Sequence, residues 1–174
     1  MTKVAMVAMA LVVPTMAAAQ ESARVHTETS FDVTVQAPIS EAAPLFTPEG
    51  ERPWAGKHWD PQYVYASGSG RDGVGAVFTI QHGPVQAVWV VTLRDLDARH
   101  FQYVYSMPGL LVTTIDVRFE AASASTTVAH VSYARTAVTP EGDEHVRTLT
   151  EQDKTASAVW QKSINDYIQG RAKK

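Results

Sequence analysis

Three side chains in the second half of the sequence have the chemistry to act on a bound molecule: Asp153, His130 and Arg135. Asp153 falls within the apolar stripe of a predicted helix, between Leu149 and Ala156. A carboxyl turned into an apolar cavity can serve as an acid or as an anchor for a ligand. Because Asp is rarely fully buried, we expect Asp153 at the rim of the stripe, in contact with solvent or with a neighbouring side chain.

His130 lies in the last predicted strand. A hairpin folded about Ser123 would place His130 opposite Asp116 on one face and Val131 opposite Ile115 on the other. The more apolar face of a half-buried strand is the inner one, so we expect His130 to point outward. A shift of one residue in the pairing would reverse this expectation.

Arg135 follows Val131 and Tyr133 at alternate positions of the same strand. It is either a charge at the strand end that reaches solvent or a cation at the mouth of a cavity that binds an acidic group, and both alternatives stay open. An enzyme of cyclase or hydratase type, working without a metal, would use Asp153, His130 or Arg135 to polarise a bound carbonyl compound.

Other catalytic signatures are missing from the sequence. The segment Ser67-Gly68-Ser69-Gly70 resembles a nucleophile elbow, but it lies in a turn between strands rather than between a strand and a helix. The histidines do not pair at the spacing of metal ligands on a helix, and most lie at predicted strand ends or in loops: His26, His58, His82, His100, His130 and His145. We therefore assign no catalytic residue, no metal ligand and no cofactor, and we favour a protein that is not an enzyme.

Residues 1–19 have the pattern of a signal peptide. Lys3 gives a positive start, Val4 to Val13 is an uncharged apolar run, and Ala17 to Ala19 places small residues before the cleavage point. The run is short for a membrane span. The alternatives are a buried core segment and an uncleaved anchor. We predict cleavage at Gln20 or within two residues of it, and an exported protein that is periplasmic or secreted.

The composition limits the partners of the mature chain. The formal net charge is -3 for the full sequence and -4 without Lys3, and the cations are scattered among acids, so the sequence offers no basic patch for nucleic acid or for an anionic membrane. No second apolar run reaches the length of a membrane span, so we expect no stable membrane insertion after cleavage. There is no Cys, and stability must come from the core alone. We expect residues 20–174 to form one domain, a monomer or a weak dimer.

A long amphipathic helix is predicted over residues 142–168. Its apolar residues recur at steps of three and four: Val146, Leu149, Ala156, Trp160, Ile164, Tyr167 and Ile168. Polar residues such as Gln161 lie between them and suit a solvent face. Gly170 is expected to end the helix. Such a stripe must be covered, and a curved antiparallel sheet is the available cover.

The rest of the chain predicts strands and two short helices. Ser40 is expected to cap a first short helix that ends at Phe46, and Thr47 with Pro48 begins a second. Alternating residues and turn signals predict strands over 27–37, 62–67, 76–81, 85–94, 101–107, 111–119 and 126–138. This order indicates one antiparallel meander. A lipocalin-type barrel is the rival, but it fits neither the two short helices nor the long terminal one.

The order of elements, with the run Leu45-Phe46-Thr47-Pro48-Glu49-Gly50-Glu51-Arg52, then Trp54 and Trp59-Asp60-Pro61, resembles the START-like or Bet v 1-like superfamily. It looks like the bacterial SRPBCC or polyketide cyclase-like branch, whose segment commonly ends Gly-Trp-Asp-Pro, whereas His58 stands here in place of that Gly. The resemblance implies an α+β helix-grip fold, with a curved sheet of about seven strands around a long C-terminal helix and a cavity between them. It implies little about chemistry, because one fold hosts many functions.

The alternation of each strand and the helix stripe together predict the cavity wall. The candidate ligand-binding residues are Phe78, Ile80, Trp89, Val91, Tyr103, Tyr105, Ile115, Val117, Val131, Tyr133, Asp153, Ala156 and Trp160. Trp54 and Trp59 are expected to act as core wedges that hold the short helices. Such a wall favours a small apolar or amphipathic molecule. The alternatives are the cyclase or hydratase type of enzyme and a non-catalytic domain whose cavity is filled by side chains.

Overall fold

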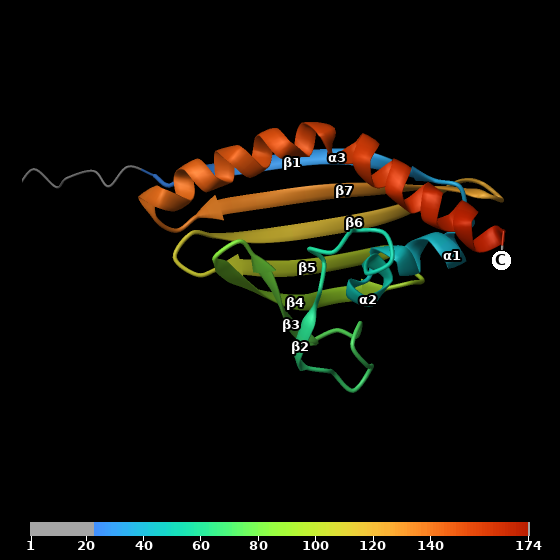
Figure 1. Cartoon of the computed structure of the whole chain (residues 1–174), viewed down its shortest axis with the longest axis horizontal. Helices are drawn as coiled ribbons and strands as arrows, with labels where there is room; N and C mark the ends of the chain where they lie inside the picture. The colour runs from blue at the N-terminus through green and yellow to red at the C-terminus, as the bar shows by residue number, and fades with distance from the viewer. Residues whose placement is uncertain (1–22, 174) are drawn as a thin grey trace, which may run out of the picture.

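The structure, a computed structural model, describes residues 23–173 and consists of one curved sheet with a long helix against one face (Figure 1). The sheet has seven antiparallel strands in the order β1-β7-β6-β5-β4-β3-β2. Their bounds are β1 (His26–Val35), β2 (Gln62–Tyr65), β3 (Val77–His82), β4 (Val85–Asp95), β5 (His100–Met107), β6 (Leu111–Ser123) and β7 (Thr126–Ala137). The predicted α+β helix-grip architecture is thus confirmed. The predicted signal peptide lies outside the described residues.

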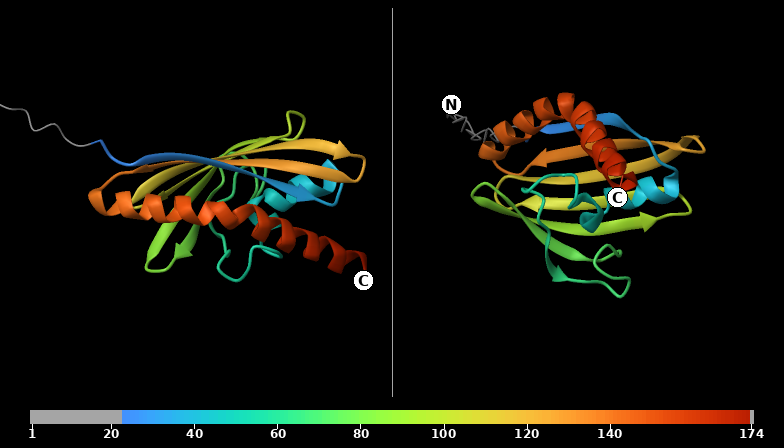
Figure 2. Two further views of the ribbon diagram at one scale, coloured as in Figure 1. Left: turned by 90° about the horizontal axis from the view of Figure 1, so that it is seen from above. Right: turned by 45° about the vertical axis from the view of Figure 1, so that its right-hand side comes forward.

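Strict alternation explains why the sheet has one apolar face. In β5 every second residue is buried, from Phe101 to Met107, and in β6 the same holds from Leu111 to Phe119. Successive side chains of a strand point to opposite faces, so one face collects the large apolar residues. This inner face is the one that the long helix covers (Figure 2).

The hairpin between β6 and β7 differs from the prediction by two residues. His130 lies opposite Arg118 rather than Asp116, and Val131 lies opposite Val117. The physical reason is the position of the turn, which falls at Ala124 and Ser125 rather than at Ser123, together with an irregularity in the register between Ala121 and Ser123. A shift of two residues keeps every side chain on its own face. His130 therefore still points outward, as predicted.

The short helices follow β1 as α1 (Ile39–Ala42), a 3₁₀ turn η1 (Ala43–Phe46) and α2 (Pro48–Glu51). The expected cap at Ser40 is wrong: the cap position is Pro38, two residues earlier, and the helix has no side-chain cap. Thr47 does cap α2, because its hydroxyl accepts a hydrogen bond from the Gly50 backbone N–H at 3.1 Å.

A contact with the glycine-rich loop between β2 and β3 holds α2 in place. The Asp72 carboxylate accepts from the Thr47 hydroxyl and from the backbone N–H of Glu49, both at 3.0 Å. Gly50 is required in this turn, because a Cβ there would stand 1.8 Å from the Pro44 carbonyl oxygen. The bonds from Asp72 and the close approach of Gly50 to Pro44 together fix the position of α2.

The long helix α3 (Pro140–Ala172) begins and ends beyond the predicted limits. Thr139 caps it by accepting from the Gly142 N–H at 3.1 Å, and a Cβ at Gly142 would stand 1.9 Å from the Leu110 carbonyl oxygen. Gly170 does not end the helix. Glycine ends a helix when it takes a left-handed conformation, and Gly170 does not; inside an exposed last turn it costs only about 1 kcal/mol.

Polar side chains of α3 bond to the free backbone edge of β1. The Ser157 hydroxyl donates to the Asp32 carbonyl, the Gln161 side chain accepts from the Thr34 N–H, and Asn165 bonds to Thr34 and Gln36. Four residues of a helix advance by about 6 Å and two residues of a strand by about 6.7 Å. Every fourth residue of α3 can therefore meet every second residue of β1. Gln161, expected on the solvent face, therefore holds the sheet edge.

Candidate functional site

A cavity of about 470 Å³ lies between the inner face of the sheet, α3 and the segment that contains α2. The sheet contributes aromatic, aliphatic and polar side chains: Phe78, His82, Trp89, Tyr103, Tyr105, Ile115, Val117, Tyr133 and Arg135. Helix α3 contributes Leu149, Gln152, Asp153, Thr155, Ala156, Val159, Trp160 and Ser163. The α2 segment contributes Phe46, Pro48, Glu51, Trp54, Ala55, His58 and Trp59. The space between sheet and helix is therefore not filled by side chains.

Most of the predicted wall residues do lie on this wall: Phe78, Trp89, Tyr103, Tyr105, Ile115, Val117, Tyr133, Asp153, Ala156 and Trp160. Ile80, Val91 and Val131 do not, although they are fully buried. Alternation assigns a residue to a face, but a small side chain on that face can be covered by a larger neighbour. Val91 lies opposite Tyr103, for example. That the wall binds a ligand remains a prediction.

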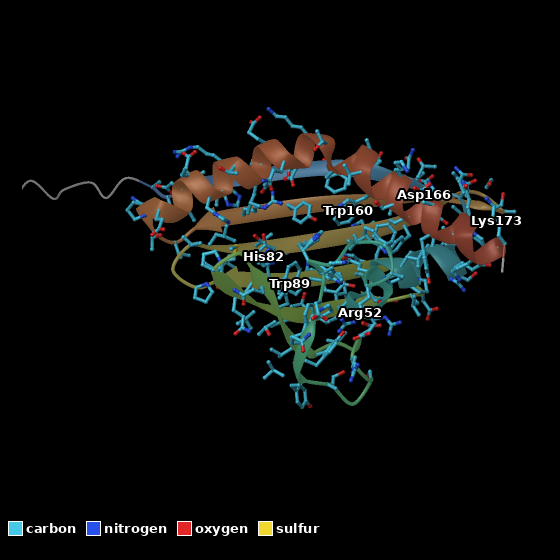
Figure 3. All side chains as sticks on the ribbon, in the orientation of Figure 1. Arg52, His82, Trp89, Trp160, Asp166 and Lys173 are labelled. Carbon is cyan, nitrogen blue, oxygen red and sulfur yellow. The ribbon has the colours of Figure 1, made fainter. Side chains whose placement is uncertain are left out.

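Neighbouring strands build an aromatic wall by pairing across the sheet. Trp89 lies opposite both Phe78 and Tyr105, and its ring stacks on them with centroids 5.7 and 4.3 Å apart. His82 lies parallel to Trp89 at 6.4 Å, and Trp59 meets Trp89 edge-on at 5.3 Å. Figure 3 shows His82 and Trp89 beside each other on the sheet. This wall offers a continuous aromatic surface to a ligand.

Trp160 of α3 faces a second aromatic group. Its ring meets Phe31 of β1 edge-on at 5.4 Å, Trp54 at 5.4 Å and Phe46 at 6.3 Å. Trp160 therefore packs on the sheet through β1, as well as on the short helices. Ala156 lies one helical turn before it and leaves room on the wall.

Trp54 and Trp59 have two roles where the sequence suggested one. As expected, they brace the short helices: the Trp54 indole N–H donates to the Leu45 carbonyl at 2.7 Å, and that of Trp59 to the Pro48 carbonyl at 2.9 Å. Both rings also line the cavity. The prediction that they are core wedges alone is therefore corrected.

Arg135 of β7 and Asp153 of α3 form an ion pair inside the cavity. Arg135 Nη2 lies 3.0 Å from Asp153 Oδ1, Nη1 bonds to Oδ2, and the side chains are only 4% and 11% exposed. Burial opposes the charged form of Arg135, but the hydrogen bond to Asp153 and the charge interactions with Asp153, Tyr105 and Tyr133 together outweigh it and raise the pKa of Arg135. The guanidinium also lies 4.2 Å above the Tyr133 ring.

The expectation that Asp153 sits at the solvated rim is therefore wrong. The reason is that α3 is rotated so that Asp153 faces β7, where Arg135 and the Thr29 hydroxyl bond to it. Arg135 is neither solvated nor a free cation at the cavity mouth. Each residue was predictable as a candidate, but the pairing depends on how the helix sits on the sheet.

Glu51 is a functional candidate that the sequence did not suggest. It ends the four-residue α2, lines the cavity and is only 9% exposed. Burial raises the pKa of its carboxyl well above the usual range, and the charge of Asp72 raises it further, so the protonated form is favoured. The available signal was its spacing of three residues before Trp54, which places both side chains on one face of a helical turn.

His82 was expected to be a solvated residue at a strand end, but it lies half-buried on the cavity wall. Burial lowers its pKa, and the neighbouring His58 and His145 lower it further. The Nε2 atom of His82 and the indole nitrogen of Trp89 are buried without a hydrogen-bond partner among the described residues. His58 also lines the cavity.

His130 takes no part in the cavity. Its Nδ1 lies 2.7 Å from Asp32 Oδ1 on the outer face of the sheet, and it is exposed. An enzyme of cyclase or hydratase type could therefore draw on Asp153 and Arg135, but not on His130. Within residues 23–173 there is no group of three His, Cys, Asp or Glu placed to hold a metal ion. No helix in that range is long and apolar enough to cross a membrane.

No protein-family model matches the sequence, and no curated protein matches it significantly. Several solved structures match it in fold. Norcoclaurine synthase from Thalictrum flavum, in complex with dopamine and hydroxybenzaldehyde, is 14% identical, with a TM-score of 0.58 over 89% of this chain and 95% of the other. Ara h 8.0201 is 16% identical, with a TM-score of 0.61 over 84% and 99%.

The di-domain ARO/CYC BexL from the BE-7585A biosynthetic pathway is also 16% identical, with a TM-score of 0.60 over 82% of this chain and 46% of the other. The strand order, the two short helical segments after β1 and the terminal helix agree with this likeness. At these identities the likeness establishes the fold alone. The chain has the Bet v 1-like helix-grip fold.

Proposed function

We propose that this protein is exported and binds a small apolar or amphipathic molecule in the cavity between the sheet and α3. The cavity itself supports this proposal most directly. Its volume of about 470 Å³ falls within the range of about 300–1,000 Å³ that is usual for ligand pockets. A domain whose cavity is filled by side chains does not account for this space.

The wall supports an apolar ligand rather than a sugar or a nucleotide. The Trp89, Phe78 and Tyr105 rings stack on one another and line the cavity, and Trp160 lies on the side of α3. Burial of apolar area contributes roughly 25 cal/mol per Å² before the costs of association. The complex of norcoclaurine synthase with dopamine and hydroxybenzaldehyde is a precedent for small aromatic molecules in this fold.

An enzyme of cyclase or hydratase type is the alternative, and one observation favours it. The cavity contains an acid in Glu51 and a buried ion pair in Arg135 and Asp153, and such groups can polarise a bound carbonyl. The ARO/CYC protein among the similar structures is compatible with this alternative. Binding without conversion of a carbonyl ligand would favour the binding protein.

An uncharged fluorescent probe tests the binding proposal. N-phenyl-1-naphthylamine should bind the folded protein saturably, with a blue-shifted emission. Ala156→Trp should abolish this binding, because the indole fills the space beside Trp160. Ala158→Trp is the matched control, since Ala158 is exposed on the same helix and does not line the cavity. It should bind the probe like the wild type.

Two outcomes would count against binding in this cavity. If Ala156→Trp binds the probe as well as Ala158→Trp does, the signal comes from another surface. If no uncharged apolar probe binds the stable wild-type protein, the filled domain becomes the better description.

The export part of the proposal rests on the signal-peptide pattern of residues 1–19. The intact mass of the exported protein should correspond to a chain that begins at Gln20 or within two residues of it. Recovery of the chain from a membrane fraction with Met1 still in place would contradict export with cleavage.

A further inference from the structure

The cavity wall holds hydrogen-bond donors for which the protein supplies no acceptor. The indole N–H of Trp89 is buried on this wall without an acceptor among the described residues, and an indole nitrogen can only donate. The Nε–H of Arg135 is likewise buried without an acceptor among the described residues, while its terminal nitrogens bond to Asp153. A buried donor without an acceptor is costly. A ligand that brings acceptor atoms therefore gains more than a hydrocarbon does.

Glu51 adds a third polar group, and its surroundings decide its form. Its carboxyl has no hydrogen-bond or ion-pair partner among residues 23–173. The charge of Asp72, from the β2–β3 loop, acts on it, and Glu51 in turn raises the pKa values of Tyr103 in β5 and Tyr133 in β7. None of these three carries a positive charge, and Asp72 disfavours a second negative charge. In the O–H form, Glu51 is a further donor towards the cavity.

We propose that Glu51, in its O–H form, donates a hydrogen bond to an uncharged oxygen of the ligand, so that the cavity prefers neutral molecules with a carbonyl or ether oxygen over hydrocarbons of the same shape. This inference rests on the proposed function, because it names the polar contact of the molecule held in that cavity. A ligand carboxylate is disfavoured, since Arg135 is already paired with Asp153. An ammonium is disfavoured as well, since a protonated Glu51 gives it no counter-ion.

A pair of probes that differ by one carbonyl tests the proposal. Fluorene and 9-fluorenone share a flat three-ring frame, and each can be titrated against bound N-phenyl-1-naphthylamine at neutral pH. The wild type should bind 9-fluorenone about fivefold to tenfold more tightly than fluorene, the gain expected for one net hydrogen bond. Glu51→Leu should lower the ratio of the two affinities to about one. A cooperative denaturant melt shows that the variant is folded.

Glu51→Gln is the matched control, because its amide keeps an N–H donor and carries no charge at any pH. It should keep the preference for 9-fluorenone. As the pH rises through the raised pKa of Glu51, the wild type should lose the preference, because the carboxylate can only accept. Glu51→Gln should not lose it.

Three outcomes would overturn the proposal. One is an undiminished preference for 9-fluorenone in Glu51→Leu while both probes bind. Another is tighter binding of cationic 9-aminofluorene than of 9-fluorenone by the wild type, which would make Glu51 a counter-ion. If neither fluorene nor 9-fluorenone displaces a bound probe, the proposed function fails and the inference fails with it.

Discussion

The two faces of the sheet each carry a basic group bonded to a carboxylate, and the two pairs differ in surroundings more than in geometry. On the inner face, Arg135 and Asp153 meet at 3.0 Å with side chains 4% and 11% exposed. On the outer face, His130 and Asp32 meet at 2.7 Å with side chains 44% and 65% exposed. The second contact of the inner pair, from Arg135 Nη1 to Asp153 Oδ2, is 2.5 Å long, so distance alone hardly separates the two pairs. Water and salt screen exposed charges, so burial is what makes the inner pair the stronger one.

The largest expected effect follows from breaking the inner pair. Arg135→Met should lower the free energy of unfolding by about 3–5 kcal/mol, because it leaves the Asp153 carboxylate buried with only the Thr29 hydroxyl as a partner. Guanidinium chloride unfolding measures this loss.

The double variant Arg135→Met with Asp153→Leu is the control for that experiment. It removes both charges, so it should recover most of the lost stability. A single variant as stable as the wild type would show that the inner pair is as weak as the outer one.

A smaller loss is expected from the aromatic group beside that pair. Trp160→Ala removes contacts with Phe31, Phe46 and Trp54, but one side of the ring already faces the cavity. We expect a loss of about 2 kcal/mol, below the roughly 3–5 kcal/mol of a fully packed Trp. Urea melts of the two proteins decide this. A loss under about 0.5 kcal/mol, the range of surface positions, would mean that Trp160 does not pack on the sheet.

The outer pair should matter little. His130→Asn should change the free energy of unfolding by less than about 0.5 kcal/mol, because the imidazole and Asp32 are both well exposed and screened. Urea unfolding, run at low and at high salt, checks this value. A loss comparable to that of Arg135→Met would break the comparison between the faces.

The smallest and most specific test is the titration of one imidazole on each face. The hydrogen bond to Asp32 raises the pKa of His130 above 6.5, whereas burial lowers the pKa of His82 below 6.5. The contribution of His130 to stability is thus present below about pH 6.5 and lost as the pH rises through its folded pKa. For His82, stability is lost as the pH falls through about 6.5, because the unfolded chain then binds the proton more readily.

Imidazole NMR signals, assigned with His82→Asn and His130→Asn, measure both pKa values. The expected result is two values on opposite sides of 6.5. Equal pKa values would mean that His82 in the cavity is as accessible to water as His130 on the outer face.

Alternation predicted the faces of the sheet well, because a slip of one residue would have turned Tyr103 and Tyr105 outward. It did not predict the pairing of His130, since a shift of two residues leaves every face unchanged. It also could not separate Tyr103, which lines the cavity, from its cross-strand neighbour Val91, which does not. A pattern along one strand contains no information on the size of the neighbours across the sheet.

The polar part of the site was harder to predict than its apolar wall. Asp153 and Arg135 were candidates, but their pairing depends on the rotation of α3 over β7. Glu51 lies in a helix of four residues, and its burial depends on the loop contact through Asp72 rather than on the local sequence. Long periodic elements are therefore readable from the sequence, whereas short elements held by tertiary contacts are not.

The bonds from α3 to the edge of β1 also determine how separate copies of this protein can meet. An open strand edge offers free N–H and C=O groups to strands of other molecules, which is a route to aggregation. β1 is ten residues long and lies at one edge of the sheet, where Ser157, Gln161 and Asn165 occupy its backbone groups. Helix α3, which closes the cavity, therefore also protects this edge from pairing with other molecules. Any change that detaches it opens both the ligand site and a template for intermolecular strand pairing.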